Sequence, residues 1–304
     1  MSEHHHHHHH HHHHGPVNSS MNTVFVFCII LNVVFVVVEA LVGLFENSLS
    51  LLSDAGHNLS DVFSLVLVLV AFRLAKVKPD THFTYGYKKS TVLISLLNAI
   101  ILLVAVGAIV VESVDKFYHP AEINGAAVSW TAFVGIIING LTTVLLMRGQ
   151  KDDLNVRGAF LHMAADTLVS VGVVVSGIII IYTGWTLVDP IVSLLIAGVI
   201  LVSTWNLLAD SLRLSMDGIP EGMEVDQISK VIEEQEHVLG AHHIHVWPIS
   251  TTETAMTAHV VIDDLGTMEE VKHHLKHRLK DAGIGHSTLE FETDGCHCEE
   301  QCCD

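Results

Sequence analysis

Long apolar stretches, separated by short polar breaks, occupy the chain from Met21 to about Ser211. A membrane-spanning helix needs roughly 20 mainly apolar residues, because it must cross the hydrocarbon core of a bilayer. Six stretches meet this requirement: 23–45, 51–75, 91–114, 128–147, 159–183 and 188–210. The pattern predicts six transmembrane helices over residues 21–211. Residues 1–20 contain an unbroken His run and are a purification tag and linker.

The basic residues of the loops predict how these helices cross the membrane. If the N-terminus is cytoplasmic, the inner loops and helix ends carry eight Lys or Arg: Arg73, Lys76, Lys78, Lys88, Lys89, Arg148, Lys151 and Arg157. The outer loops carry only Lys116. Short cytoplasmic loops are enriched in basic residues. We therefore expect a multi-pass protein of the inner (plasma) membrane with both termini in the cytoplasm.

The pattern changes after residue 211, where polar and apolar positions alternate over short distances. Helical periodicity covers 225–236 and 266–282, and strand-like alternation covers 243–249, 254–263 and 288–292. The order αββαβ predicts a cytosolic α/β domain over residues 212–292, with two helices on a three-stranded sheet. Residues 293–304 form a polar, Cys-rich tail.

Charge is concentrated in this second half of the chain. The whole sequence is 50% hydrophobic and 16% charged, with a formal net charge of −18. Nineteen Asp or Glu and six Lys or Arg follow residue 211. Such a balance argues against nucleic acid as a partner and suits a domain that meets cations.

Two short motifs inside the apolar stretches carry the candidate chemistry. His57-Asn-Leu-Ser-Asp61 and His162-Met-Ala-Ala-Asp166 each place a His and an Asp four residues apart. This spacing puts both side chains on one face of a helix. Ionisable groups in a bilayer are costly and mark function. Hydrogen bonding between helices is the alternative, but two pairs with the same spacing favour a tetrahedral site for a divalent metal such as zinc.

A metal site of this kind exchanges protons for metal. Neutral imidazole and carboxylate bind zinc, whereas their protonated forms do not, so binding releases protons. The sequence predicts a transporter of divalent metal driven by protons, since it has no phosphate-binding loop motif. A membrane metal sensor without net transport is the alternative. An enzyme is disfavoured, because four ligands fill a tetrahedron and leave no position for water.

Three motifs together resemble the cation diffusion facilitator family, in its zinc-preferring bacterial branch. They are Ser50-Leu-Leu-Ser-Asp-Ala-Gly-His-Asn-Leu-Ser-Asp61, Phe83-Thr-Tyr-Gly-Tyr-Lys88 and the His162–Asp166 pair. The resemblance covers nearly all of 21–292. It implies a homodimer that exports zinc, or cadmium or cobalt, in exchange for protons by alternating access. It also implies a metallochaperone-like cytosolic domain that holds regulatory zinc.

The resemblance also assigns residues outside the membrane. It implies a cytosolic metal site of His242, His259 and Glu292, with His286 as a bridging ligand. It implies that Lys88 or Lys89 pairs with Asp217. Some members carry a further metal site between the second and third spans. Here Phe83 and Tyr87 stand where those members have His, so we expect no full site there.

The tail contains Cys296, Cys298, Cys302 and Cys303. These thiols are too local to form a disulfide framework. Thiolates are good ligands for zinc, copper(I) and cadmium. We expect metal capture by the tail, with Cys302 and Cys303 as ligands. An unstructured end with incidental thiols is the alternative.

Overall fold

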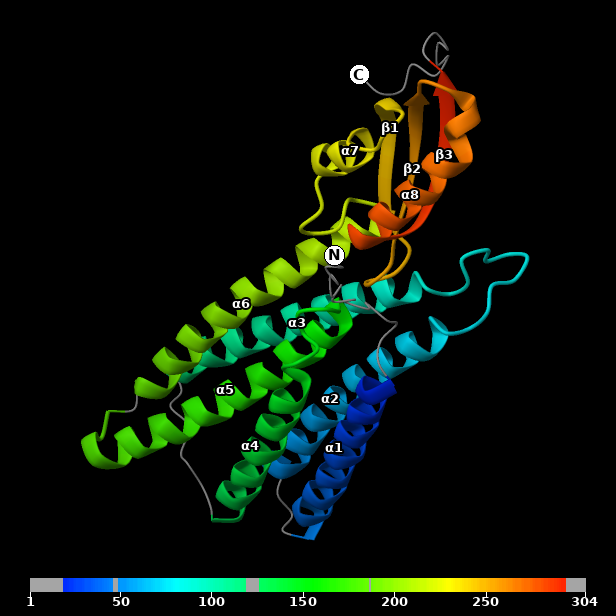
Figure 1. Cartoon of the computed structure of the whole chain (residues 1–304). Helices are drawn as coiled ribbons and strands as arrows, with labels where there is room; N and C mark the ends of the chain where they lie inside the picture. Colours follow the sequence, from blue (N-terminus) through cyan, green and yellow to red (C-terminus); the bar gives the residue numbers. More distant parts are fainter. Residues whose placement is uncertain (1–18, 46–48, 119–125, 186, 294–304) are drawn as a thin grey trace, which may run out of the picture.

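The computed structural model describes residues 19–45, 49–118, 126–185 and 187–293. Its first part is a bundle of long helices, with a small domain at one end (Figure 1). The helices are α1 (Ser19–Phe45), α2 (Leu49–Leu74), α3 (Ser90–Tyr118), α4 (Ala126–Leu146), α5 (Leu154–Thr183) and α6 (Val188–Ser215). Five are long and apolar enough to span a membrane, and the shorter apolar stretch of α4 is Phe133–Leu146. The predicted fold class is confirmed.

The bundle is built around two apolar clusters that share one helix. The first joins α1, α2, α4 and α5, with Phe25, Phe72 and Met163 fully or almost fully buried. The second joins α3, α5 and α6 through Leu102, Ala165 and neighbouring residues. Helix α5 therefore packs on both sides, and it carries His162 and Asp166.

Polar side chains also connect the helices. The Asn32 Nδ2 atom donates to Thr142 Oγ1 at 3.1 Å and links α1 to α4. The hydroxyls of Ser95 and Ser211 lie 2.8 Å apart and link α3 to α6. A hydrogen bond between helices contributes about 1 kcal/mol, so these contacts adjust a packing that apolar residues dominate.

The small domain consists of α7 (Val225–Glu233), β1 (Val238–Pro248), β2 (Thr254–Ile262), a short 3-10 helix (Leu265–Thr267), α8 (Met268–Asp281) and β3 (Ile284–Thr293). The sheet order is β1-β2-β3, with β1 antiparallel and β3 parallel to β2. Both helices pack against one core, to which Ile232, Val260, Leu275 and Leu279 contribute buried side chains. The predicted αββαβ order is confirmed.

Strands β1 and β3 begin earlier than the sequence pattern predicts. Strand β1 starts at Val238 because Gly240, Ala241 and His242 already pair with β2. The register shifts between His242 and His245, and His243 has a φ of 49°. This bulge breaks the alternation of polar and apolar positions, so the first half of the strand lacks the signal by which strands are recognised.

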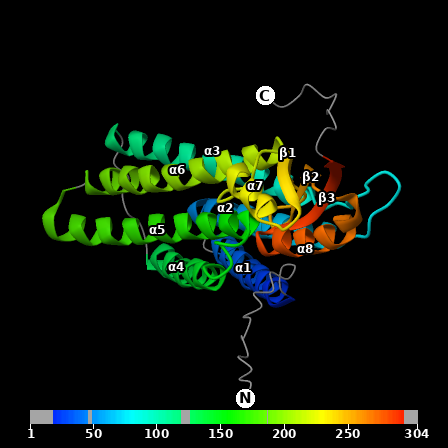
Figure 2. The ribbon, with the colours of Figure 1, turned by 45° about the horizontal axis from the view of Figure 1, so that its top comes forward.

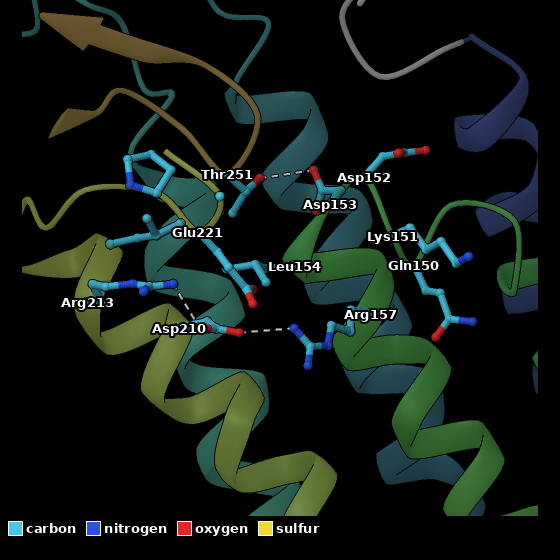
Figure 3. Close-up of a pocket in the computed structure, with 13 residues that line it drawn as sticks. Gln150, Lys151, Asp152, Asp153, Leu154, Arg157, Asp210, Arg213, Glu221 and Thr251 are labelled. Atoms are coloured by element: carbon cyan, nitrogen blue, oxygen red, sulfur yellow. Dashed lines mark hydrogen bonds and ion pairs between the residues drawn. The ribbon is translucent and has the colours of Figure 1, made fainter. Parts of the chain in front are cut away.

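The turn between β1 and β2 rests on the N-terminal ends of α3 and α5. The Thr251 backbone N–H donates to Thr91 Oγ1 at 3.1 Å. The Thr251 hydroxyl donates to Asp153 Oδ2 at 2.9 Å, as Figure 3 shows. Asp153 also caps α5, and burial raises the pKa of its carboxyl. The beginning of α5 is thereby tied to the turn that joins the two strands.

A cavity of about 350 Å³ lies beside this contact, between α5, α6 and the linker to the small domain. Arg157 and Arg213 both reach the Asp210 carboxylate there, at 3.0 and 3.1 Å (Figure 3). The junction is therefore a polar, partly open seam between the two domains.

Lys89 is the most connected side chain of this junction. Its Nζ atom donates to Asp217 Oδ1 at 2.5 Å, to the Leu214 carbonyl at 3.0 Å and to the Pro248 carbonyl at 3.2 Å. The Lys89–Asp217 pair implied by the family resemblance is present, whereas Lys88 pairs with Glu253. One ammonium group thus joins α3, the end of α6 and β1.

Replacing Lys89 with Ala should loosen the junction. The change removes three hydrogen bonds but acts on a group that is 36% exposed, so we expect a loss of about 1 kcal/mol rather than the full value of a buried pair. Proteolysis in the linker 216–222 should become faster and the Tm should fall. Lys230→Ala, on the exposed face of α7, is the control. Equal proteolysis of both variants and the unchanged chain would contradict this role.

Candidate metal centres

Helices α2 and α5 bring the four predicted membrane ligands together. His162 Nε2 lies 2.7 Å from Asp61 Oδ1, and His57 Nε2 lies 3.4 Å from Asp166 Oδ1. His162 Nε2 is also 3.9 Å from Asp166 Oδ2. Each helix contributes one His and one Asp, and every His faces the Asp of the other helix. The four residues form one cluster.

The spacing of this cluster fits a tetrahedral zinc ion. Zinc binds imidazole nitrogen and carboxylate oxygen at about 2.0–2.1 Å, so neighbouring ligand atoms lie roughly 3.3 Å apart. The observed separations bracket this value. Ligand atoms of His57, Asp61 and Asp166 all lie within 4.8 Å of one another. His162 is not part of this tight group of three, although its Nε2 atom lies 2.7 Å from Asp61 Oδ1. A tetrahedral site would therefore need the His162 side chain to move toward the other three.

Two carboxylate oxygens distinguish a metal site from simple bonding between helices. Asp61 Oδ2 and Asp166 Oδ2 are buried and have no hydrogen-bond partner among the described residues. A buried carboxylate oxygen without a partner is costly. Hydrogen bonding between the helices leaves these two oxygen atoms without a partner, whereas a cation between the carboxylates would bind both of them.

Access to the cluster is one-sided. The side chains of Asp61, His162 and Asp166 are 1%, 6% and 13% exposed, whereas that of His57 is 52% exposed. His57 is thus the least buried of the four side chains in the described chain.

A third acidic residue supports the cluster from α1. Glu39 is fully buried, and its Oε2 atom accepts a hydrogen bond of 2.7 Å from Asn58 Nδ2. Asn58 directly follows His57 in the sequence. This bond links α2 to α1 at the level of the candidate metal ligands.

A second cluster lies on the sheet of the small domain. His242 and His259 are paired across β1 and β2, and β3 contributes Glu292. His259 Nδ1 lies 2.6 Å from Glu292 Oε1, and His242 Nε2 lies 3.5 Å from Glu292 Oε2. Ligand atoms of all three residues lie within 4.8 Å of one another. Two imidazoles and a carboxylate in this geometry suit zinc, with room for a fourth ligand.

Two further residues join this cluster without having been predicted as its ligands. Glu290 Oε2 lies 3.6 Å from His259 Nε2. The His243 ring centroid lies 5.0 Å from that of His259. The sequence signal for Glu290 is its two-residue spacing from Glu292, which puts both on one face of a strand. His243 reaches the cluster only because of the β1 bulge.

The structure corrects the expectation for His286. This residue pairs with Ala255 at the beginning of β3, and Glu292 lies near its end. Six residues of strand separate the two by roughly 20 Å. Within one chain His286 cannot bridge the cytosolic cluster, because the two residues flank opposite ends of the same strand. Its ring instead contacts Tyr85, with centroids 5.6 Å apart.

In the loop between α2 and α3, the carboxylate of Asp80 accepts hydrogen bonds that hold the turn, and so it is not free to bind a metal. Asp80 accepts hydrogen bonds from the backbone N–H of Phe83 and His82 at 2.8 and 2.7 Å, and from the Tyr87 hydroxyl at 3.2 Å. The backbone donors lower the pKa of its carboxyl. The Phe83 and Tyr87 rings pack at 4.7 Å. Cys302 and Cys303, the predicted tail ligands, lie outside the described residues.

Comparisons with known proteins agree with this architecture. Residues 25–214 match the cation efflux transmembrane domain, and residues 220–292 match the cytoplasmic domain of cation efflux proteins. The chain is 36% identical to a cadmium, cobalt and zinc/H(+)-K(+) antiporter of Bacillus subtilis, over 86% of this chain and 85% of that protein.

Two further relatives match this chain with similar identity and coverage. The zinc transporter ZitB of Escherichia coli is 35% identical, over 86% of this chain and 85% of its own length. The metal cation efflux system protein CzcD of Cupriavidus metallidurans is 35% identical, over 86% and 84%. The chain is thus a multi-pass membrane protein that belongs to the cation efflux family, the cation diffusion facilitators, whose members are transporters and not enzymes.

Proposed function

We propose that this protein exports zinc from the cytoplasm in exchange for protons, through the cluster of His57, Asp61, His162 and Asp166. The observation that carries the proposal is the pairing of two His and two Asp across α2 and α5, where two buried carboxylate oxygens accept no hydrogen bond from the described residues. The names of the relatives support zinc as substrate, with cadmium and cobalt as further substrates.

Exchange follows from competition for the same lone pairs. An imidazolium or a carboxylic acid cannot coordinate zinc, so metal binding expels protons and protonation expels metal. A rise in proton concentration on one side of the membrane therefore favours release of zinc to that side. At the cytoplasmic side, where protons are scarcer, the deprotonated ligands favour zinc loading.

Alternating access is supported by the packing of the bundle. Helices α1, α2 and α4 share one apolar cluster, and α3 and α6 share another. Helix α5 belongs to both and carries two of the ligands. Sliding of α5 together with α3 and α6 against α1, α2 and α4 changes the exposure of the site.

The cytosolic cluster serves as a regulatory zinc site in a homodimer. Three strands supply its ligands, so metal binding rigidifies the sheet, and the β1–β2 turn carries any strain to α5 through Thr251. The membrane sensor remains the second candidate function. It shares the cytosolic cluster, but it gives no reason for four ionisable ligands inside the membrane domain.

The membrane site is tested by zinc uptake into proteoliposomes under an imposed pH gradient. Asp61→Asn keeps the size of the side chain and removes a negative charge, so we expect a loss of transport of at least about 100-fold, from several kcal/mol of weaker binding. Ser64→Ala, three residues further along α2, is the control and should transport normally. Normal transport by Asp61→Asn, or uptake that is independent of the gradient, would sink the proposal.

Metal choice should depend on His57. His57→Asp replaces a borderline nitrogen ligand with a hard oxygen, which should shift preference from zinc toward manganese or iron(II). Competition of each metal with zinc uptake measures this shift. Because a carboxyl with an ordinary pKa of about 3.9 carries fewer protons at pH 6–7 than an imidazole, the pH dependence should also flatten. An unchanged metal order would argue against His57 as a ligand.

The regulatory role is tested in the full chain without the His run of residues 1–20, which itself binds metal. His259→Ala should lower the zinc stoichiometry by about one ion per chain and leave Asp61-dependent transport measurable, at an altered rate. His274→Ala, on the exposed face of α8, should change neither. If His259→Ala binds as much zinc as the unchanged chain, the cytosolic site is wrong. If neither the unchanged chain nor any variant transports zinc, and His259→Ala abolishes the response of the chain to metal, the sensor is favoured.

A further inference from the structure

A second cavity, remote from both metal clusters, lies between α8 and the beginning of β3. Its volume is about 530 Å³. Its charged and polar lining consists of Glu269, Lys272, His273, Lys276, His277, Lys280, His286 and Ser287. Neither the proposed transport nor the cytosolic zinc site uses any of these residues.

The lining reverses the charge of the domain around it. Nineteen Asp or Glu and six Lys or Arg follow residue 211. Three of those six basic residues line this one cavity, and only one of the acidic residues, Glu269, does so. Segregation of this kind makes a local positive potential in an acidic domain, and such a potential attracts anions.

The basic groups lie along one face of a single helix. Lys272, Lys276 and Lys280 follow one another at four-residue spacing, which places their side chains along one face of α8. Lys272 is neutralised by Glu269 at 2.6 Å. Lys276 and Lys280 have no acidic partner within 4 Å among the described residues, so their charge is available.

Three imidazoles complete the cavity. The rings of His273 and His277 lie 4.9 Å apart on α8, and His286 faces them from β3. Each imidazole can donate an N–H to an acceptor oxygen, as can the Ser287 hydroxyl. Their ligand atoms do not form one of the tight groups of three found at the two metal clusters of the described chain. Together with the lysines, this favours an oxyanion over a metal ion.

The cavity lies at the end of the domain nearest the membrane helices. His286 contacts Tyr85 in the loop between α2 and α3. Figures 1 and 2 show this loop, in cyan, running beside α8 and β3. The same loop exposes Val77, Phe83 and Tyr85. Aromatic residues and lysines at the end of a span are typical of the headgroup region of a bilayer.

We propose that this cavity binds a phosphate-bearing anion. The chemistry is that of a phosphate group held by ammonium groups, imidazole N–H groups and a hydroxyl. Two sources share it: the headgroup of an anionic lipid in the cytoplasmic leaflet, and free phosphate. The position beside the loop makes the lipid the more accessible of the two.

The test uses the full chain without residues 1–20 in a neutral detergent. It is titrated with short-chain phosphatidylglycerol, with phosphatidylcholine of the same chain length, and with inorganic phosphate, and the Kd is measured by thermophoresis. Lys276→Gln/Lys280→Gln should weaken anion binding by at least about fivefold, the factor expected for one lysine charge at a membrane surface. Lys230→Gln, an exposed helical lysine of the same domain, is the control and should leave the Kd unchanged.

The outcomes separate the two sources. Lysine-dependent binding of phosphatidylglycerol but not of phosphatidylcholine or phosphate supports a lipid site. Lysine-dependent binding of inorganic phosphate with equal strength supports a soluble anion. Zinc stoichiometry, unchanged in the double variant, shows that the domain is still folded. The proposal is overturned if no anion binds, if the double variant and Lys230→Gln behave alike, or if His273→Ala/His277→Ala removes a zinc ion.

Discussion

The contact between His162 and Asp61, at 2.7 Å across α2 and α5, is the interaction on which the rest of the structure depends. Both side chains are almost completely buried, and Asp166 lies beside them. Two carboxylates in such surroundings repel each other strongly unless a cation or protons compensate them. The membrane domain therefore always needs a positive partner at this point. Zinc and protons are the two candidates, and their mutual exclusion is the physical basis of the exchange proposed above.

The connection from this site to the cytosolic domain is short and made of named contacts. Helix α5 carries His162 and Asp166, and its first turn is capped by Asp153. Asp153 accepts a hydrogen bond from Thr251, which lies in the turn between the two strands that bear His242 and His259. The Thr251 hydroxyl also accepts a hydrogen bond from Asn155 Nδ2 of α5 at 3.4 Å, so the turn of the sheet and α5 share two polar contacts. Lys89 holds the junction together from the side of α3.

The features that depend on local sequence patterns could be predicted from the sequence. The spans follow from length and apolarity, and the juxtaposition of two His and two Asp follows from two four-residue spacings on helices. The cytosolic site was harder, because its geometry depends on strand register. The structure brings His242 and His259 together, whereas His286 lies at the opposite end of β3 from Glu292. The expectation of a bridging His286 failed because the sequence does not reveal how far a strand separates the residues that flank it. The β1 bulge that brings His243 near His259 leaves no periodic signal.

The central claim, that zinc and protons compete for one set of ligands, is tested most directly by counting protons released when zinc binds. Calorimetry of the chain without residues 1–20, in two buffers with different heats of ionisation, gives this number at each pH. We expect between one and two protons per zinc at the membrane site near pH 6, fewer at pH 8, and none at that site in Asp61→Asn/Asp166→Asn. Zinc binding at the membrane site without any proton release at pH 6 would contradict the account.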